Sequence, residues 1–340
     1  MTLIRTGPDS RPALLLEIPD FRLRSGEPLA AGLKRLSLNE IEVSIDGFYD
    51  GEEVFELAVH EARKSTKRLR AMLRLVRSEV GEKVYRYENR FFREISRLLS
   101  DVRSASAVAL AMGQIRDTYA PLLAEGVFAD PVGRLETRRQ KVLERAMEDP
   151  HLVSGVVARL EAAHDRFSRW PSDASPTPGY GIGIRDSFAA IGPGLDDTFS
   201  RGRAEMVAAY GRPTAPFFHS WRKRVKYLRY QMELLTPLWP EGILAMALAL
   251  ERVGELLGED HDLAELVALL TDRPDLCPNP IERSLIRAVA QQRRSDLQIA
   301  CRILGKRVFA ETPGSLSTRM EAYWESSHEP LPESVRILQG

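Results

Sequence analysis

Apolar and polar positions follow a helical period along most of the chain. From Glu52 onward, apolar residues recur at the spacing expected for the buried face of an amphipathic helix. Alternating runs of β-branched residues, which would indicate strands, do not occur beyond residue 50. The pattern therefore predicts an all-α fold. The expected helices cover residues 52–79, 82–100, 103–123, 133–147, 150–170, 184–210, 214–237, 240–258, 260–271, 280–305 and 313–326.

Proline and glycine divide this helical pattern into two halves. The segment 171–183 holds three prolines and three glycines, a composition that favours a linker. We therefore expect a first helical bundle at 52–170 and a second at 184–326. Several prolines make 1–51 an irregular N-terminal segment, with a short helix or strand left open between Leu33 and Ile45. The tail, 327–340, is also expected to be irregular.

One predicted helix carries an unusually basic face. Residues 59–77 contain seven Lys or Arg residues and a single acidic residue, Glu61. On a helical wheel, the cations and one histidine fall within an arc of about 120°, opposite an apolar back. This face consists of His60, Arg63, Lys64, Lys67, Arg70 and Arg74. A single basic helix of this kind is more often a solvated surface than a binding site.

The same arrangement occurs a second time after the linker. The segment beginning at His219 aligns with the segment beginning at His60, so the basic face and its apolar back are duplicated. The matched pairs are His60 with His219, Arg63 with Arg222, Lys64 with Lys223, Lys67 with Lys226, Leu69 with Leu228 and Arg70 with Arg229. Downstream, Leu98-Leu99-Ser100 and Arg103 match Leu256-Leu257-Gly258 and His261, with one residue fewer in the second copy. We expect the two faces to meet across one groove.

These motifs resemble the conserved-histidine α-helical domain, the CHAD family, over residues 52–326. The resemblance is carried by His60-x-x-Arg63-Lys64-x-x-Lys67-x-Leu69-Arg70, by its second copy from His219 to Arg229, by Thr198-Phe-Ser-Arg201-Gly-Arg203, by Leu257-Gly258 with His261-Asp262, by Leu304-Gly305-Lys306-Arg307 and by Tyr323-Trp324. The first copy departs from the family pattern, because Arg103 is followed by Ser104 rather than Asp and Ser100 replaces a glycine.

The resemblance implies both a fold and a function. The expected fold is two four-helix bundles related by a pseudo-twofold axis around a basic central groove or pore. The expected function is binding of inorganic polyphosphate, with polyphosphate granules or triphosphate-tunnel enzymes as associated partners. An older proposal for the family, metal chelation by the histidines, remains an alternative.

Phosphate chemistry suits the duplicated basic faces. Arginine offers planar, often bidentate donors to phosphate oxygens, and lysine acts as a mobile point charge. The histidines either donate to phosphate or hydrogen-bond the backbone and orient their helices. The predicted polyphosphate-binding residues are His60, Arg63, Lys64, Lys67, Arg70, His219, Arg222, Lys223, Lys226 and Arg229, with Arg201 and Arg203 as further candidates.

Other functions are less well supported by the residues. Nucleic acid shares the phosphate chemistry, but aromatic side chains interleave only the second copy, at Tyr227 and Tyr230. Asp260-His261-Asp262 offers metal ligands at adjacent positions, which point in different directions on a helix. No Walker loop, nucleophile elbow or paired carboxylates accompany the basic faces. We therefore predict a non-catalytic protein without a cofactor, and nucleic acid stays open as an alternative ligand.

Bulk composition adds little to the choice of ligand. Lys and Arg equal Asp and Glu at 48 each, so net charge alone predicts no anionic partner. The two cysteines cannot form a disulfide framework, and the N-terminus lacks the pattern of a signal peptide. No apolar run reaches the length of a membrane helix. We therefore expect a cytoplasmic protein. The family resemblance adds association with polyphosphate granules to this expectation.

Overall fold

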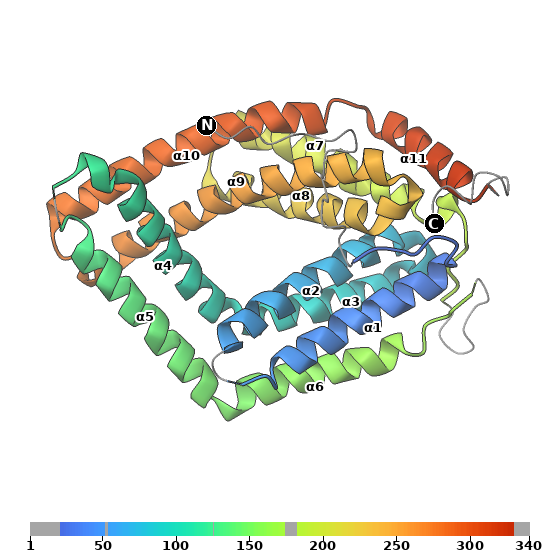
Figure 1. Cartoon of the computed structure of the whole chain (residues 1–340), viewed down its shortest axis with the longest axis horizontal. Helices are drawn as coiled ribbons and strands as arrows, with labels where there is room; N and C mark the ends of the chain where they lie inside the picture. Colours follow the sequence, from blue (N-terminus) through green and yellow to red (C-terminus); the bar gives the residue numbers. More distant parts are fainter. Residues whose placement is uncertain (1–20, 52–53, 125, 174–181, 330–340) are drawn as a thin grey trace, which may run out of the picture.

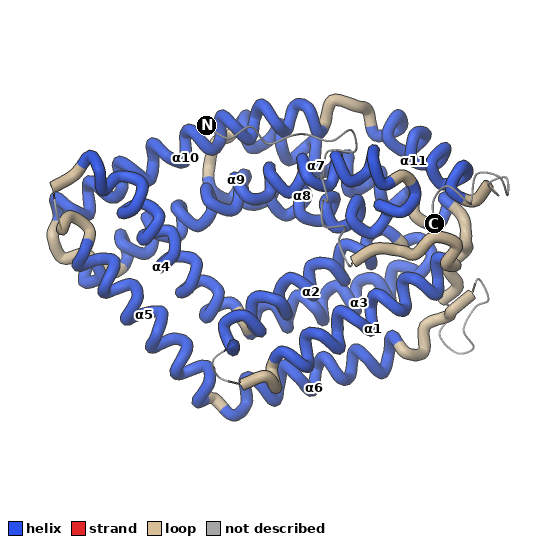
Figure 2. Tube along the Cα trace, in the orientation of Figure 1, coloured by secondary structure: helices blue, strands red, loops and turns tan. Residues whose placement is uncertain are grey.

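The computed structural model describes residues 21–51, 54–124, 126–173 and 182–329. Every regular element in these ranges is a helix (Figure 2), so the predicted all-α class is confirmed. The α-helices are α1 (Leu29–Gly47), α2 (Phe55–Leu75), α3 (Arg77–Leu98), α4 (Ser100–Tyr119), α5 (Ala129–Glu148), α6 (Pro150–Phe167), α7 (Gly192–Gly211), α8 (Ala215–Leu235), α9 (Pro240–Asp272), α10 (Pro280–Val308) and α11 (Pro313–Ser327). Short 3₁₀ turns lie at Ala120–Leu122, Phe188–Ala190, Thr236–Leu238 and Pro274–Leu276.

The helices pack as two groups, and a pair of helices, α4 and α5, links the groups at one end (Figure 1). α1, α2, α3 and α6 lie against one another, and α7 to α11 form the second group (Figure 1). α4 and α5 run antiparallel at one end of the molecule, where α4 also contacts α9 and α10 (Figure 1). At the centre, α2 packs directly on α8 and α7. The two duplicated basic helices, α2 and α8, are therefore neighbours. A pseudo-twofold relation between the two groups stays a prediction.

Local sequence signals explain where several helices begin. Asn279 precedes α10, and its side chain accepts hydrogen bonds from the backbone N–H groups of Ile281 and Glu282. Proline occupies the first turn of α6, α10 and α11, where its missing N–H costs no helical hydrogen bond. Such capping residues fix helix starts locally. This is why the boundaries predicted from the sequence lie close to the observed ones for α6, α10 and α11.

Two expectations about the helices were wrong. The N-terminal segment is not irregular up to residue 51, because α1 occupies 29–47, directly after Pro28. The backbone N–H of Leu29 donates to Asp186 Oδ1 at 2.9 Å, a cap that comes from a distant part of the chain. Residues 240–258 and 260–271 are not two helices but one, α9, which continues through Gly258.

Other sequence expectations fall wholly or partly outside the described residues. The linker predicted at 171–183 includes 174–181, and the predicted tail includes 330–340, neither of which is described. The same holds for residues 1–20 of the N-terminal segment. Across the described ranges, none of the helices combines the length and the apolar character needed to cross a membrane.

The contact between the two groups is held by close backbone approach and buried hydrogen bonds. A Cβ atom at Gly194 of α7 would lie 2.1 Å from the carbonyl oxygen of Leu75 in α2. Nearby, buried Gln231 of α8 donates from Nε2 to the carbonyl oxygen of Ala71 and to Thr198 Oγ1, both at 3.1 Å. These contacts fix how α2 lies relative to α7 and α8.

We expect Gly194→Ala to destabilise the protein. The added methyl group would press on the α2 backbone, and overpacking of this kind costs about 1–3 kcal/mol. Gly113→Ala is the matched control, because a Cβ in the middle of α4 meets no atom within 4 Å. It should stabilise by roughly 0.5–1 kcal/mol. Urea unfolding followed by circular dichroism measures both, and equal midpoints would contradict a close α2–α7 contact.

Candidate functional site

A cavity of about 520 Å³ lies where α2, α4, α8 and α9 meet. α2 and α8 present their basic faces to it, and the C-terminal part of α3 contributes one wall through Ser96. Eight of the twelve residues predicted from the sequence line this cavity. They are His60, Arg63, Lys67 and Arg70 from α2, and His219, Arg222, Lys223 and Lys226 from α8. The structure thus brings the two copies of the motif to one cavity.

The other four predicted residues lie outside the cavity lining. Lys64 pairs with Glu61 one turn away on α2, at 2.8 Å between Nζ and Oε2. Arg201 pairs with Asp197 on α7, also at 2.8 Å. Arg203 extends toward the Glu311 carbonyl oxygen, 3.5 Å away. Lys64 belongs to the predicted basic arc, and Arg201 and Arg203 belong to a basic run. Neither pattern determines whether a side chain faces the cavity.

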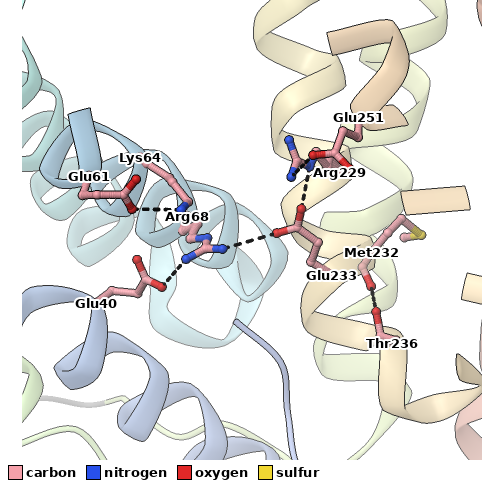
Figure 3. Close-up of polar contacts among 9 residues, drawn as sticks. All are labelled: Glu40, Glu61, Lys64, Arg68, Arg229, Met232, Glu233, Thr236 and Glu251. Carbon is pink, nitrogen blue, oxygen red and sulfur yellow. Dashed lines mark hydrogen bonds and ion pairs between the residues drawn. The ribbon is translucent and has the colours of Figure 1, made fainter. Parts of the chain in front are cut away.

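Arg229, the fourth residue, belongs to a buried ion network (Figure 3). Its guanidinium lies 2.5 Å from Glu233 and 2.7 Å from Glu251. Glu233 also lies 3.9 Å from Arg68 of α2, which pairs with Glu40 of α1 at 2.8 Å. The network connects α1, α2, α8 and α9 beside the cavity (Figure 3). Arg229 is therefore neutralised by carboxylates, whereas its counterpart Arg70 pairs with no carboxylate in the described part of the chain.

Lys67 of α2 and Lys226 of α8, the two central lysines, pair with no carboxylate among the residues that the structure describes. Burial, followed by the charges of Arg63 and Arg222, lowers the pKa of Lys67 to about 7. Burial and the charges of Arg222 and Lys67 hold the pKa of Lys226 well below its ordinary value. These charges come from both α2 and α8, so the two basic faces interact electrostatically across the cavity. Near neutral pH Lys67 can gain a proton when an anion arrives.

Two arginines at matching positions also keep unsatisfied donors. The Nε atoms of Arg63 and Arg222 are buried and make no hydrogen bond within the described residues. Burial comes first among the causes that lower the pKa of each guanidinium. The absence of a side chain at Gly258 of α9 leaves room for the Arg222 guanidinium, because a Cβ at Gly258 would lie 3.3 Å from Arg222 Nη2. Buried unsatisfied donors are uncommon in native proteins, and here they mark the cavity as a place for acceptors.

The histidines of the motif are held in their neutral form. Burial and the charge of neighbouring His261 lower the pKa of His219 to about 4, and the two ring centroids are 4.3 Å apart. Desolvation and the charge of Arg103 lower the pKa of His60. Neutral imidazole can donate one N–H to a phosphate oxygen without adding charge.

Four charged residues that line the cavity were not among the polyphosphate-binding residues predicted from the sequence, namely Asp101, Arg103, Asp262 and Glu265. Arg103 of α4 lies 3.5 Å from Asp262 of α9. Glu265 accepts a hydrogen bond from Ser104 at 3.2 Å and lies 3.2 Å from His261 Nε2. A signal was present, since Arg103 and His261 occupy matching positions after the paired leucines of the two copies.

Three side chains of α9 could contribute to a metal site, which was the alternative predicted from the sequence. His261, Asp262 and Glu265 each place a ligand atom within 4.8 Å of the others. Asp260 is not part of this group, because it is buried and accepts hydrogen bonds from Arg294 and Gln298 of α10. Arg103 stands beside Asp262, so positive charge disfavours a metal ion at this point.

The tyrosines of the second copy are not free to stack on bases. The guanidinium of Arg74 lies 4.1 Å from the ring centroid of Tyr227, and that of Arg70 lies 5.7 Å away. Tyr230 is 5% exposed, and its side chain packs in the hydrophobic core. Stacking of unpaired bases requires accessible ring faces, which these two residues do not provide.

Comparisons with known proteins agree with this architecture. A family model described as CHAD domain matches residues 35–271, from within α1 to the end of α9. Among solved structures, the chain is similar to PptA from Streptomyces chartreusis, with 16% sequence identity and a TM-score of 0.57. That alignment covers 83% of this chain and 98% of PptA, and at this identity it shows a shared fold. No protein among the curated sequences compared with the chain matches it.

Lys67 should make stability depend on pH. Its pKa is about 7 in the folded protein and about 10.4 when unfolded, so the unfolded state binds more protons between these values. Stability should therefore rise as pH increases from 7 to 10. Lys67→Met should remove this contribution and raise the free energy of unfolding at pH 7 by up to roughly 4 kcal/mol.

Lys64→Met is the control for this substitution. Lys64 lies three residues away on α2 and is half exposed beside Glu61, so its loss should change stability by about 0.5 kcal/mol or less. Urea unfolding at several pH values compares the two variants. Identical pH profiles for Lys67→Met and the unaltered protein would show that Lys67 is fully protonated in the folded state.

Proposed function

We propose, starting from the fact that the chain belongs to the CHAD family, that its central cavity binds inorganic polyphosphate without reacting with it. The observation that carries this proposal is the convergence of unneutralised cations. Arg63 and Lys67 from α2 and Arg222 and Lys226 from α8 line one cavity. Holding like charges together is unfavourable unless a ligand of opposite charge repays it.

The groups in the cavity suit a chain of phosphates better than a single compact anion. Arginines on both α2 and α8 can donate to the oxygens of neighbouring phosphates, and the lysines supply mobile charge between them. A polyanion that contacts several of these groups at once would release many counterions. Affinity should accordingly fall steeply with salt. The cytoplasmic location and the association with polyphosphate granules or triphosphate-tunnel enzymes belong to the same proposal.

The acidic groups of the cavity support a binding role over a catalytic one. Asp262 is engaged by Arg103, and Glu265 is engaged by Ser104 and His261. Hydrolysis of phosphoanhydrides ordinarily uses divalent metal ions held by carboxylates next to the phosphates. Two of the three carboxylates that line this cavity, Asp262 and Glu265, instead contact Arg103 and His261.

The first test uses two lysines on the same helix. Lys67→Gln removes a cavity cation, and we expect affinity for long-chain polyphosphate to fall about tenfold, with a shallower salt dependence. Lys64→Gln makes the same chemical change outside the cavity and should leave affinity within about twofold. Isothermal titration at several salt concentrations measures both. Equal losses would mean that only general surface charge matters.

Single-stranded DNA in the same titration tests ligand class. Because the faces of Tyr227 are covered by arginines, we expect DNA to bind more weakly than polyphosphate at equal phosphate concentration. Equal or tighter DNA binding would contradict polyphosphate as the ligand.

Binding should also weaken as pH rises. Lys67 has a pKa of about 7 in the free protein, and a bound polyanion would raise it, so binding takes up protons above pH 7. Affinity is therefore expected to decrease between pH 7 and 9 in the unaltered protein and to decrease less in Lys67→Gln. Titrations in buffers with different ionisation enthalpies measure the proton uptake directly. Zero uptake at pH 8 would contradict this assignment.

A hydrolysis assay tests the non-catalytic part of the proposal. Long-chain polyphosphate incubated with the protein and Mg²⁺ or Mn²⁺ should release no more orthophosphate than a sample without protein. Release that disappears in Glu265→Gln would identify the cavity as catalytic, because Glu265 is one of its lining carboxylates.

A further inference from the structure

A second groove, of about 570 Å³, runs along the C-terminal part of α3 and borders the central cavity. The two share Arg63, Ser96 and Ser100 in their linings. The groove adds three arginines of α3, which we call the α3 arginines: Arg90, Arg93 and Arg97. Because Arg63, Ser96 and Ser100 line both, the groove is the direct neighbour of the cavity, and Arg63 is a cation common to the two.

The α3 arginines leave most of their charge available. Arg93 and Arg97 are exposed, and their side chains make no ion pair or hydrogen bond in the described part of the chain. Arg90 pairs with Glu94 at 2.8 Å, the single acidic residue in the lining. An ordinary helix surface mixes charges of both signs, whereas this one keeps an excess of positive charge that leads away from the cavity.

The second copy of the duplication does not repeat this feature. With the one-residue shift that aligns the paired leucines, the α3 arginines correspond to Leu248, Glu251 and Glu255 of α9. Glu251 neutralises Arg229 at 2.7 Å, and Glu255 pairs with Arg252 at 3.2 Å. The corresponding positions on α9 therefore hold one leucine and two glutamates in place of three arginines, and they give a polyanion no matching basic path.

The cavity lining also differs in charge between the two copies. Ser104 and Ala107 of α4 correspond to Asp262 and Glu265 of α9 under the same alignment, and all four line the cavity. At these two positions α9 has carboxylates and α4 has neutral residues, while Asp101, the carboxylate that α4 contributes to the lining, is accompanied there by Arg103. The α9 part of the lining is therefore more acidic than the α4 part, which favours a polyanion on the side of the first copy.

We propose that the groove of the α3 arginines is a second anion subsite, through which a long linear polyphosphate continues out of the central cavity in one direction. The inference rests on the proposed function of the cavity. Linear polyphosphate fits because the groove lining consists of arginine, serine and one glutamate, with no aromatic residue on which a base could stack. A ligand too short to leave the cavity makes no contact with this subsite.

The test compares ligand lengths in one double variant. Arg93→Gln/Arg97→Gln should weaken binding of long-chain polyphosphate by on the order of tenfold and lower its salt slope by about 1.5, as expected for two lost phosphate contacts. Tripolyphosphate, which is short enough to stay in the cavity, should bind within about twofold of the unaltered protein. Isothermal titration with both ligands gives the comparison.

A matched control removes two charges from the same helix outside the groove. Lys83→Gln/Arg86→Gln alters exposed residues of α3 that do not line either cavity or groove. It should leave both affinities nearly unchanged. An equal effect of the two double variants on long-chain binding would overturn the subsite, and so would an equal loss of tripolyphosphate binding in Arg93→Gln/Arg97→Gln.

The outcomes separate this inference from the function on which it rests. If the unaltered protein binds neither ligand, the proposed function fails. If both ligands bind with equal affinity per molecule and the double variant changes neither, the cavity is the whole site and the α3 subsite is wrong. If the double variant loses single-stranded DNA binding while polyphosphate binding persists, the groove serves nucleic acid and the proposal is wrong as to ligand.

Discussion

Repulsion between cations at the contact of α2 and α8 is the constraint that the surrounding structure must offset. Lys67 and Lys226 lie in one cavity with Arg63 and Arg222, and the shifts in the lysine pKa values reflect that crowding. The apolar backs of both helices supply compensation. Leu69, Leu73, Val225, Leu228 and Met232 are all fully buried. Each such side chain contributes about 1.5–3 kcal/mol through burial, enough to hold the helices against modest repulsion.

Carboxylates determine which cations remain available. Arg229 and Arg68 lie beside the cavity in a network with buried Glu233 and Glu40, so their charges hold helices together (Figure 3). Arg70, the counterpart of Arg229, instead donates to the neutral amide oxygen of Asn89 at 3.1 Å. The same residue type is thus structural in one copy and available to a ligand in the other. Neutralisation by Glu233 and Glu251, which lie outside the motif, makes this difference.

The sequence predicts what depends on local periodicity and repetition. Most helix positions, the all-α class and the eight cavity residues of α2 and α8 follow from amphipathic spacing and the duplicated motif. It does not predict what depends on distant partners. The start of α1 relies on Asp186 far along the chain, and Lys64 and Lys67 share a basic arc although only Lys67 reaches the cavity. A helical wheel gives angles, but the packing of neighbouring helices decides which part of the arc faces inward.

Duplication and divergence contribute differently to the site. Duplication places matching cations on α2 and α8, which would by itself give a cavity equally basic toward both halves. Divergence then adds Glu251 and Glu265 on α9, while the corresponding positions of the first half hold Arg93 and Ala107. Because a flexible polyanion follows the gradient of electrostatic potential, this difference would give a polymer bound as we propose a direction. A symmetric cavity could hold a polymer in either orientation, whereas the proposed ligand would follow the path over α3.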